Sequence, residues 1–182
     1  WGAAIEQTST EKALSYSKRY DVIAADTKMC LGSYVFLWGF KQETTSSWYG
    51  LFLKDGSETA VMDVLIEKWS GESPSDFAPN IHTFKINKKT PIENLKLQPR
   101  EKMNIEVDAD DTDGDELQYF LEIVPESQDK KSGGDYEKEP KVIFSAKFSD
   151  SKMTIKAPKK GNYRLFLTIK DVDHSATANF PF

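Results

Sequence analysis

The stretch Cys30-Leu-Gly-Ser-Tyr-Val-Phe-Leu-Trp38 is nearly continuous in apolar residues with high strand propensity. A strand that does not alternate between apolar and polar residues is typical of a parallel sheet covered by helices on both faces. We therefore expect a buried strand over Leu31–Trp38. One such strand does not make a sheet, which indicates that the first part of the chain is incomplete by itself.

Helical patterns flank this stretch on both sides. Thr8 and Glu11 fit a capping box, and the spacing after them predicts a helix over Thr10–Ala25. Downstream, a second short extended run covers Trp48–Leu53, and a second helix is expected over Ser57–Trp69. The apolar faces of the two expected helices contain Ala13, Tyr16, Tyr20, Ile23 and Ala24, and Val61, Met62, Leu65, Ile66 and Trp69.

The second part of the chain has a different period. Residues 73–79 are rich in Pro and Ser, which predicts a linker. Beyond it, apolar residues alternate with polar ones, the pattern of strands with one buried face. About seven such segments in roughly 100 residues predict an all-β immunoglobulin-like sandwich over residues 80–182. The segments are Ile81–Asn87, Met103–Ala109, Leu117–Ile123, Val142–Phe148, Met153–Lys156, Tyr163–Ile169 and Thr177–Phe182.

Composition limits the classes of function. With 182 residues, of which 38% are hydrophobic, the chain can bury a core. A net charge of −5 argues against nucleic acid as a partner, and no apolar run reaches the roughly 18 residues of a membrane span. A single cysteine and two histidines give no disulfide framework and little material for a His- or Cys-based metal centre. No phosphate-binding loop is present, so we expect no cofactor.

Two stretches carry a family resemblance: Trp1-Gly-Ala-Ala-Ile-Glu-Gln-Thr-Ser-Thr-Glu-Lys-Ala13 and Cys30-Leu-Gly-Ser-Tyr-Val-Phe-Leu-Trp-Gly-Phe-Lys-Gln-Glu43. With Trp48–Phe52 and Asp63–Gly71, they resemble the C-terminal end of the (β/α)8 barrel of bacterial secreted glycoside hydrolases, in the clan with two catalytic glutamates. The second part resembles the bacterial Ig-like or PKD-like modules that follow such barrels. The implied fold class is an α+β chain in two parts, an incomplete α/β TIM-barrel segment (residues 1–72) and an Ig-like sandwich.

The resemblance implies a role within a larger enzyme. The first helix corresponds to the seventh barrel helix, Leu31–Trp38 to the eighth strand and Ser57–Trp69 to the eighth helix. Both catalytic glutamates of the family then precede Trp1, so we assign no catalytic residue and expect no hydrolysis by this chain alone. The parent enzyme would act with retention on a polysaccharide or oligosaccharide. It would be secreted, periplasmic or attached to the cell surface.

Three residues are expected to bind substrate. In the family, an aromatic side chain at the position of Trp38 commonly stacks on a sugar ring, although Trp38 could instead be a packed aromatic at a strand end. Trp48 lies in the following loop, where binding residues concentrate, and Glu43 is polar and near the same barrel mouth. A lone carboxylate cannot perform a two-carboxylate hydrolysis. Glu6 is interpreted as a loop residue.

An acidic run, Asp108-Ala-Asp-Asp-Thr-Asp-Gly-Asp115, is a weak calcium candidate because it offers hard oxygen ligands at close spacing. Its spacing fails the EF-hand pattern. Asp and Gly also supply turn chemistry between two strands, and we favour this second interpretation. The candidate ligands are Asp108, Asp110, Asp111, Asp113 and Asp115.

A different class of function stays open. The chain could be a non-catalytic Ig-like module of a cell-surface protein that binds carbohydrate or protein, or that serves as a spacer. Under the enzyme interpretation, the exposed barrel-derived segment could also support a dimer, since an unpaired apolar strand seeks a neighbour.

Overall fold

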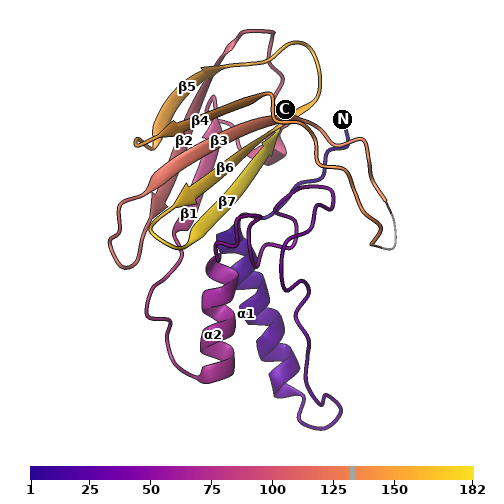
Figure 1. The fold of residues 1–182 in the computed structure, drawn as a ribbon, viewed down its shortest axis with the longest axis vertical. Helices are drawn as coiled ribbons and strands as arrows, with labels where there is room; N and C mark the ends of the chain where they lie inside the picture. The colour runs from indigo at the N-terminus through magenta and orange to yellow at the C-terminus, as the bar shows by residue number, and fades with distance from the viewer. Residues whose placement is uncertain (132–133) are drawn as a thin grey trace.

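The computed structural model describes residues 1–131 and 134–182. In these residues the chain is mostly β, with two helices ahead of seven strands (Figure 1). The elements are α1 (Ser9–Ala25), α2 (Ala60–Ser70), β1 (Asn80–Ile86), the 3-10 turn η1 (Pro91–Glu93), β2 (Lys102–Asp110), β3 (Gln118–Pro125), β4 (Phe144–Phe148), β5 (Lys152–Lys156), β6 (Tyr163–Lys170) and β7 (Ser175–Pro181). Residues 73–79, the predicted linker, contain neither helix nor strand.

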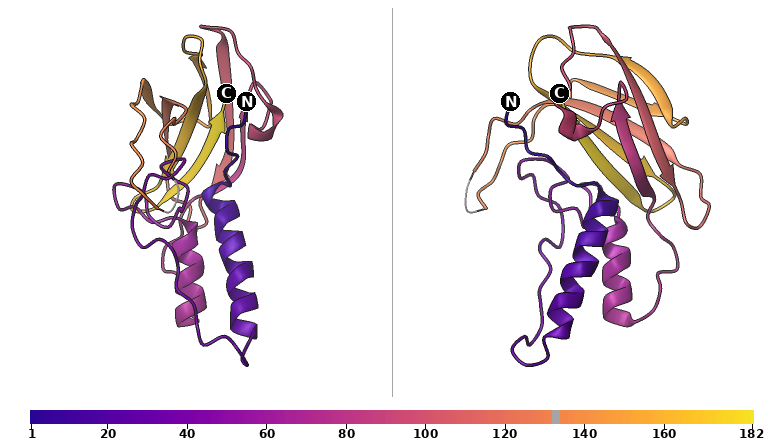
Figure 2. Two further views of the ribbon diagram at one scale, coloured as in Figure 1. Left: turned by 90° about the vertical axis from the view of Figure 1, so that its right-hand side faces the viewer. Right: turned by 180° about the vertical axis from the view of Figure 1, so that it is seen from behind.

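The strands form two antiparallel sheets. One has three strands in the order β1-β2-β5, and the other has four in the order β4-β3-β6-β7. Each of the seven strand-like segments predicted from the alternation is confirmed as a strand, with ends shifted by a few residues. The two sheets face one another, an arrangement compatible with a sandwich (Figure 2).

The main core lies between the two sheets because alternate residues of each strand point inward. In β2, Met103, Ile105 and Val107 are buried, as the period of two predicts. Across the core, the rings of Phe84 in β1 and Phe180 in β7 meet edge to face, with centroids 6.0 Å apart. Burial of these apolar faces is the dominant stabilising contribution in the second part of the chain.

Both predicted helices are confirmed. Helix α1 begins with the capping box of Thr8 and Glu11, in which each residue's side chain accepts from the other's backbone N–H. Helix α2 begins at Thr59 as its N-cap, later than predicted, and ends at Gly71 in the left-handed conformation that favours glycine. The two helices pack on each other and extend from one end of the sheets (Figure 1). Their shared core is small and consists of Ala13, Leu51, Ala60, Val61, Met62, Leu65 and Ala78.

The predicted strand over Leu31–Trp38 is wrong for this chain. The segment forms neither strand nor helix, and Leu31 and Tyr34 are fully exposed at 105% and 103%. A buried parallel strand needs neighbours for its backbone groups, and residues 1–72 supply no strand that could pair with it. The segment instead runs back beside α1, where Tyr16 donates a hydrogen bond to the Phe36 carbonyl at 3.0 Å. Trp48–Leu53 also forms no strand; Phe52 makes an isolated bridge with Glu58.

Residues from the first part cover the edge strand β7. The Thr177 backbone N–H donates to Ser9 Oγ at 2.9 Å, and the Ser175 N–H donates to the Glu58 carbonyl at 2.8 Å. Every residue of β7 is buried as a result. Among the described residues, no helix is long and apolar enough to cross a membrane.

Candidate functional site

Trp38 lies in a shallow hollow of about 290 Å³ next to the sheets. Its ring meets the ring of Phe52 edge to face, with centroids 5.1 Å apart, and 62% of its surface stays exposed. Lys54 lies over the Phe40 ring, with Nζ 5.7 Å from the centroid. The hollow is lined by Trp38, Gly39, Phe40, Phe52, Leu53, Lys54 and Gly56. The exposed indole is therefore open to a flat ligand surface.

Glu43 belongs to a neighbouring cluster in the same loop. Its carboxylate pairs with Lys41 at 2.5 Å, and hydrogen bonds from Lys41 and Tyr49 lower its pKa. Burial, together with the hydrogen bond to Glu43, raises the pKa of Tyr49 to about 12. Phe36 packs edge to face on Tyr49, with centroids 4.8 Å apart. Glu43 is thus an ionised hydrogen-bond acceptor at neutral pH and does not fit the role of a general acid.

The structure brings the three predicted substrate-binding residues into one loop region but not into one cavity. Trp38 is in the hollow, Glu43 is in the Lys41 and Tyr49 cluster, and Trp48 is half-buried and outside the lining of the hollow. What each residue binds stays a prediction.

A larger groove of about 980 Å³ lies on the outer face of the four-stranded sheet. Its floor includes Phe120 and Glu122 of β3 and Phe166 and Thr168 of β6. One border comes from residues 40–55 and the other from residues 139–142. The sequence analysis did not find this groove, because outward positions of a half-buried sheet are expected to face solvent.

A buried polar network closes one end of the groove. Arg164 of β6 donates two hydrogen bonds to the Glu126 carboxylate, at 2.9 and 2.8 Å, and one to the Ala4 carbonyl at 2.9 Å. The side chains of Arg164 and Glu126 are only 2% and 3% exposed. Arg164 also donates to Asn179, which in turn donates to Glu6. The network ties the N-terminal residues to the four-stranded sheet.

Two further acidic residues hold the loop at residues 41–47 in place. The side chain of Glu6, predicted to be a loop residue, is only 2% exposed and accepts from Lys12 and from the Thr45 hydroxyl. Glu137 is also buried, and its carboxylate accepts the Thr44 backbone N–H at 2.6 Å and the Lys131 N–H at 2.9 Å. The border of the groove is therefore fixed by charge-assisted hydrogen bonds.

The acidic run forms a turn. Asp111 Oδ1 accepts the backbone N–H groups of Asp113, Gly114 and Asp115 at 2.9, 2.9 and 3.1 Å. Asp113 accepts the Phe77 N–H at 2.7 Å, and Asp110 lies 3.1 Å from His82. In the described part of the chain, no group of three or more His, Cys, Asp or Glu side chains is arranged to hold a metal ion. The geometry favours the turn interpretation.

We expect Asp111→Ala to lower the free energy of unfolding by about 1–3 kcal/mol, because three backbone donors lose their acceptor. A chelator added to the wild-type protein should leave its Tm unchanged. Thermal unfolding with and without a chelator measures both effects. A fall in Tm on chelation would show that a bound cation, and not the turn, accounts for these carboxylates.

Asp63, in the first turn of α2, is a buried acid at the junction of the two parts. One of its oxygens accepts the Ala78 backbone N–H at 3.0 Å, while the other has no hydrogen-bond partner among residues 1–131 and 134–182. Burial raises the pKa of Asp63 to about 6, and the nearby carboxylates Glu58 and Asp76 act in the same direction. His174 and the hydrogen bond from Ala78 act against the rise.

This raised pKa gives stability a defined pH dependence. An acid whose pKa is higher in the folded state holds its proton there, so its contribution is present at about pH 4 and is lost as the pH rises past 6. Asp63→Asn stays neutral at every pH. We therefore expect the Tm of the variant minus that of the wild type to increase from pH 4 to pH 7.5. A difference that is constant over this range would contradict the assignment.

The comparisons with known proteins give no family. No family model matches the chain, and a search of curated proteins finds no match. The resemblance to the glycoside hydrolase barrel therefore rests on the motifs between Trp1 and Gly71.

Proposed function

We propose that this chain is the C-terminal part of a retaining glycoside hydrolase. In this proposal, residues 1–72 complete a (β/α)8 barrel whose other strands and both catalytic glutamates lie upstream, and residues 80–182 form an Ig-like accessory module. The chain supplies one wall of the sugar site and does not hydrolyse a glycoside by itself.

The observation that carries the proposal is the exposed segment between the two helices. Leu31, Tyr34, Phe36 and Trp38 are large side chains more than half exposed to solvent, on a segment that forms neither helix nor strand and pairs with no strand of the described residues. Contiguous exposed apolar surface of this kind is a mark of an interaction site. A neighbouring barrel strand would pair the backbone of Leu31–Trp38 and bury alternate side chains.

Within the barrel, Trp38 would lie at the C-terminal end of the eighth strand, where barrel enzymes place their sites. Its exposed indole would stack on the apolar face of a pyranose. The ionised Glu43 would accept hydrogen bonds from sugar hydroxyls, and Trp48 would border the same mouth.

The strand order supports the immunoglobulin-like character of the second part. The division with β3, β6 and β7 in one antiparallel sheet and β1, β2 and β5 in the other follows that of such a sandwich, except that β4 lies beside β3 instead of beside β5. A cell-surface binding or spacer module would share this architecture, which makes it the second candidate function. That candidate would leave the apolar segment at Leu31–Trp38 without a role.

The test is the natural gene. We expect its coding sequence to extend upstream of Trp1 by about 250 residues, with a glutamate after the fourth strand and one on the seventh. The joined protein, which is the upstream barrel together with residues 1–182, should hydrolyse at least one aryl β-glycoside of glucose, galactose, mannose or xylose. NMR of the anomeric proton should show retention. A coding sequence with no further barrel strands encoded upstream of Trp1 would rule out the proposal.

A pair of tryptophan variants locates the sugar site in the joined protein. Trp38→Ala should raise KM at least tenfold, because it removes a stacking surface. Trp69→Ala is the matched control, since Trp69 is half exposed on α2, away from the proposed mouth. Equal effects of the two substitutions would contradict a sugar-binding role for Trp38.

A further inference from the structure

We propose that the groove on the four-stranded sheet binds a neutral oligosaccharide, as a continuation of the site at Trp38. The inference rests on the proposed function and extends it. The sandwich then contributes subsites of its own, and the substrate is a chain of several sugars instead of a disaccharide.

The floor of the groove carries aromatic and hydrogen-bonding side chains on one face. In the strand register, Phe120 pairs with Thr168 and Glu122 pairs with Phe166, so the two phenylalanines are diagonal neighbours. Both phenyl rings are half-buried at the groove surface. Lys147 of β4 lies over the Phe120 ring, with Nζ 5.3 Å from the centroid. Apolar ring faces beside polar groups suit a sugar, which has apolar C–H faces and an equatorial ring of hydroxyls.

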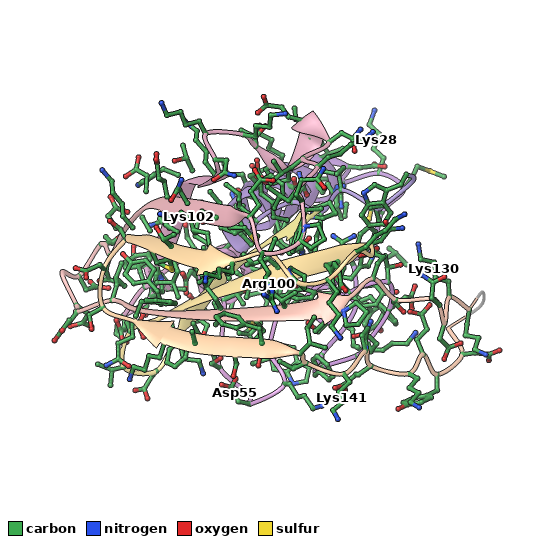
Figure 3. All side chains as sticks on the ribbon, turned by 90° about the horizontal axis from the view of Figure 1, so that it is seen from above. Lys28, Asp55, Arg100, Lys102, Lys130 and Lys141 are labelled. Carbon is green, nitrogen blue, oxygen red and sulfur yellow. The ribbon has the colours of Figure 1, made fainter. Side chains whose placement is uncertain are left out.

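The borders add further polar groups. Phe40, Gln42, Thr44 and Ser46 line one side of the groove. The opposite side comes from residues 139–142, and Asp55 and Lys141, one from each bordering segment, lie on the same side of the molecule (Figure 3). Glu137, just ahead of residues 139–142, accepts the Thr44 backbone N–H of the opposite border, and a second hydrogen bond from the Lys131 N–H holds its carboxylate in place. This bridge preorganises the groove, which lowers the entropic cost of binding.

The charges in the groove favour a neutral ligand. Four basic and four acidic residues line it, and three pairs already neutralise one another: Arg164 with Glu126, Lys54 with Glu139, and Lys170 with Asp55. The two charges left over, Glu122 and Lys147, have opposite signs, so the lining carries no net positive charge to attract an anionic chain. A neutral glycan would instead exchange hydrogen bonds with the polar groups without displacing an ion pair.

The groove is continuous with the hollow at Trp38. Phe40, Leu53 and Lys54 line both. A glycan that stacks on Trp38 therefore has a path across Phe40 to the phenyl rings on the sheet. This continuity joins the groove to the sugar site proposed at Trp38, which is why we propose a carbohydrate chain as its occupant.

Isothermal titration calorimetry of the 182-residue chain tests the inference. The probes are the hexasaccharides of β-1,4-glucan, β-1,4-xylan, β-1,4-mannan and β-1,3-glucan, with hexagalacturonate as the anionic comparison. We expect at least one neutral probe to bind and hexagalacturonate to bind at least tenfold more weakly. No binding of any neutral probe, or stronger binding of hexagalacturonate, overturns the inference.

Variants locate the binding. Phe166→Ala and Phe120→Ala should each weaken binding about tenfold, while Phe166→Trp, which keeps a stacking surface, should retain it. Tyr136→Ala is the matched aromatic control, since Tyr136 is exposed and outside the groove lining. Circular dichroism checks that each variant is folded. If an alanine variant does not fold, Phe166→Trp still tests the inference. Loss of binding in a folded Phe166→Trp protein overturns it.

The outcomes separate this inference from the proposed function. Binding that is lost in Trp38→Ala but unchanged in both phenylalanine variants overturns the groove and leaves the barrel proposal standing. Binding that depends on Phe166, in a protein whose gene has no upstream barrel, supports the groove and overturns the barrel proposal.

Discussion

Replacement of Arg164 by methionine is expected to lower the free energy of unfolding by about 3–5 kcal/mol. The substitution leaves the Glu126 carboxylate buried without its cation and removes a donor to Asn179 and to the Ala4 carbonyl. Removal of one partner from a buried ion pair costs more than removal of both, because the remaining charge has no compensation. Urea denaturation at pH 7 measures the loss.

Two companion variants make this result specific. Arg19→Met changes an exposed arginine on α1 and should alter stability by less than about 0.5 kcal/mol. The double variant Arg164→Met with Glu126→Met should recover part of the stability that Arg164→Met loses. A loss below about 1 kcal/mol in Arg164→Met would show that the network is not required for folding.

The second large effect is expected at Phe180. Phe180→Ala should cost about 3–5 kcal/mol, because the side chain is fully buried between the sheets and packs on Phe84. Leu31→Ala is the contrasting variant and should cost less than about 0.5 kcal/mol, since Leu31 is exposed. Urea denaturation of both variants measures the difference.

This pair tests where the core lies. If Leu31→Ala destabilised the chain as much as Phe180→Ala, the segment at residues 31–38 would be buried in solution, as its sequence predicts.

Local patterns predicted most of the fold. The capping box of Thr8 and Glu11 is a short-range signal, and α1 begins where it predicts, whereas α2 begins later than its sequence pattern predicts. The strands were also predicted correctly, because apolar and polar residues alternate along a strand when one face of its antiparallel sheet is buried. The prediction for Leu31–Trp38 was wrong because an apolar run of high strand propensity forms a strand only where another strand pairs with it, and residues 1–72 contain no strand.

The candidate site was less predictable. Trp38 and Glu43 stood out as side chains in an aromatic-rich loop, but the groove depends on segments more than 100 positions apart in the chain. Arg164 lies at an outward position of β6, where alternation predicts contact with water. Ala4 contacts Arg164, and Glu6 contacts Asn179 beside it. These contacts join residues far apart in the sequence, so no local sequence pattern predicts them. The role of Glu137 was not predicted either, because a glutamate in a polar segment is expected to face solvent.

The way residues 9 and 58 cap β7 has a practical consequence for dissecting this protein. A truncated protein that begins at residue 73 would lack the residues that cover β7. The unpaired N–H and C=O groups of β7 could then pair with a strand of another molecule. We therefore do not expect residues 80–182 to behave well when they are expressed alone. A truncated protein should begin upstream of Ala4, so that it keeps the N-terminal residues that contact the four-stranded sheet.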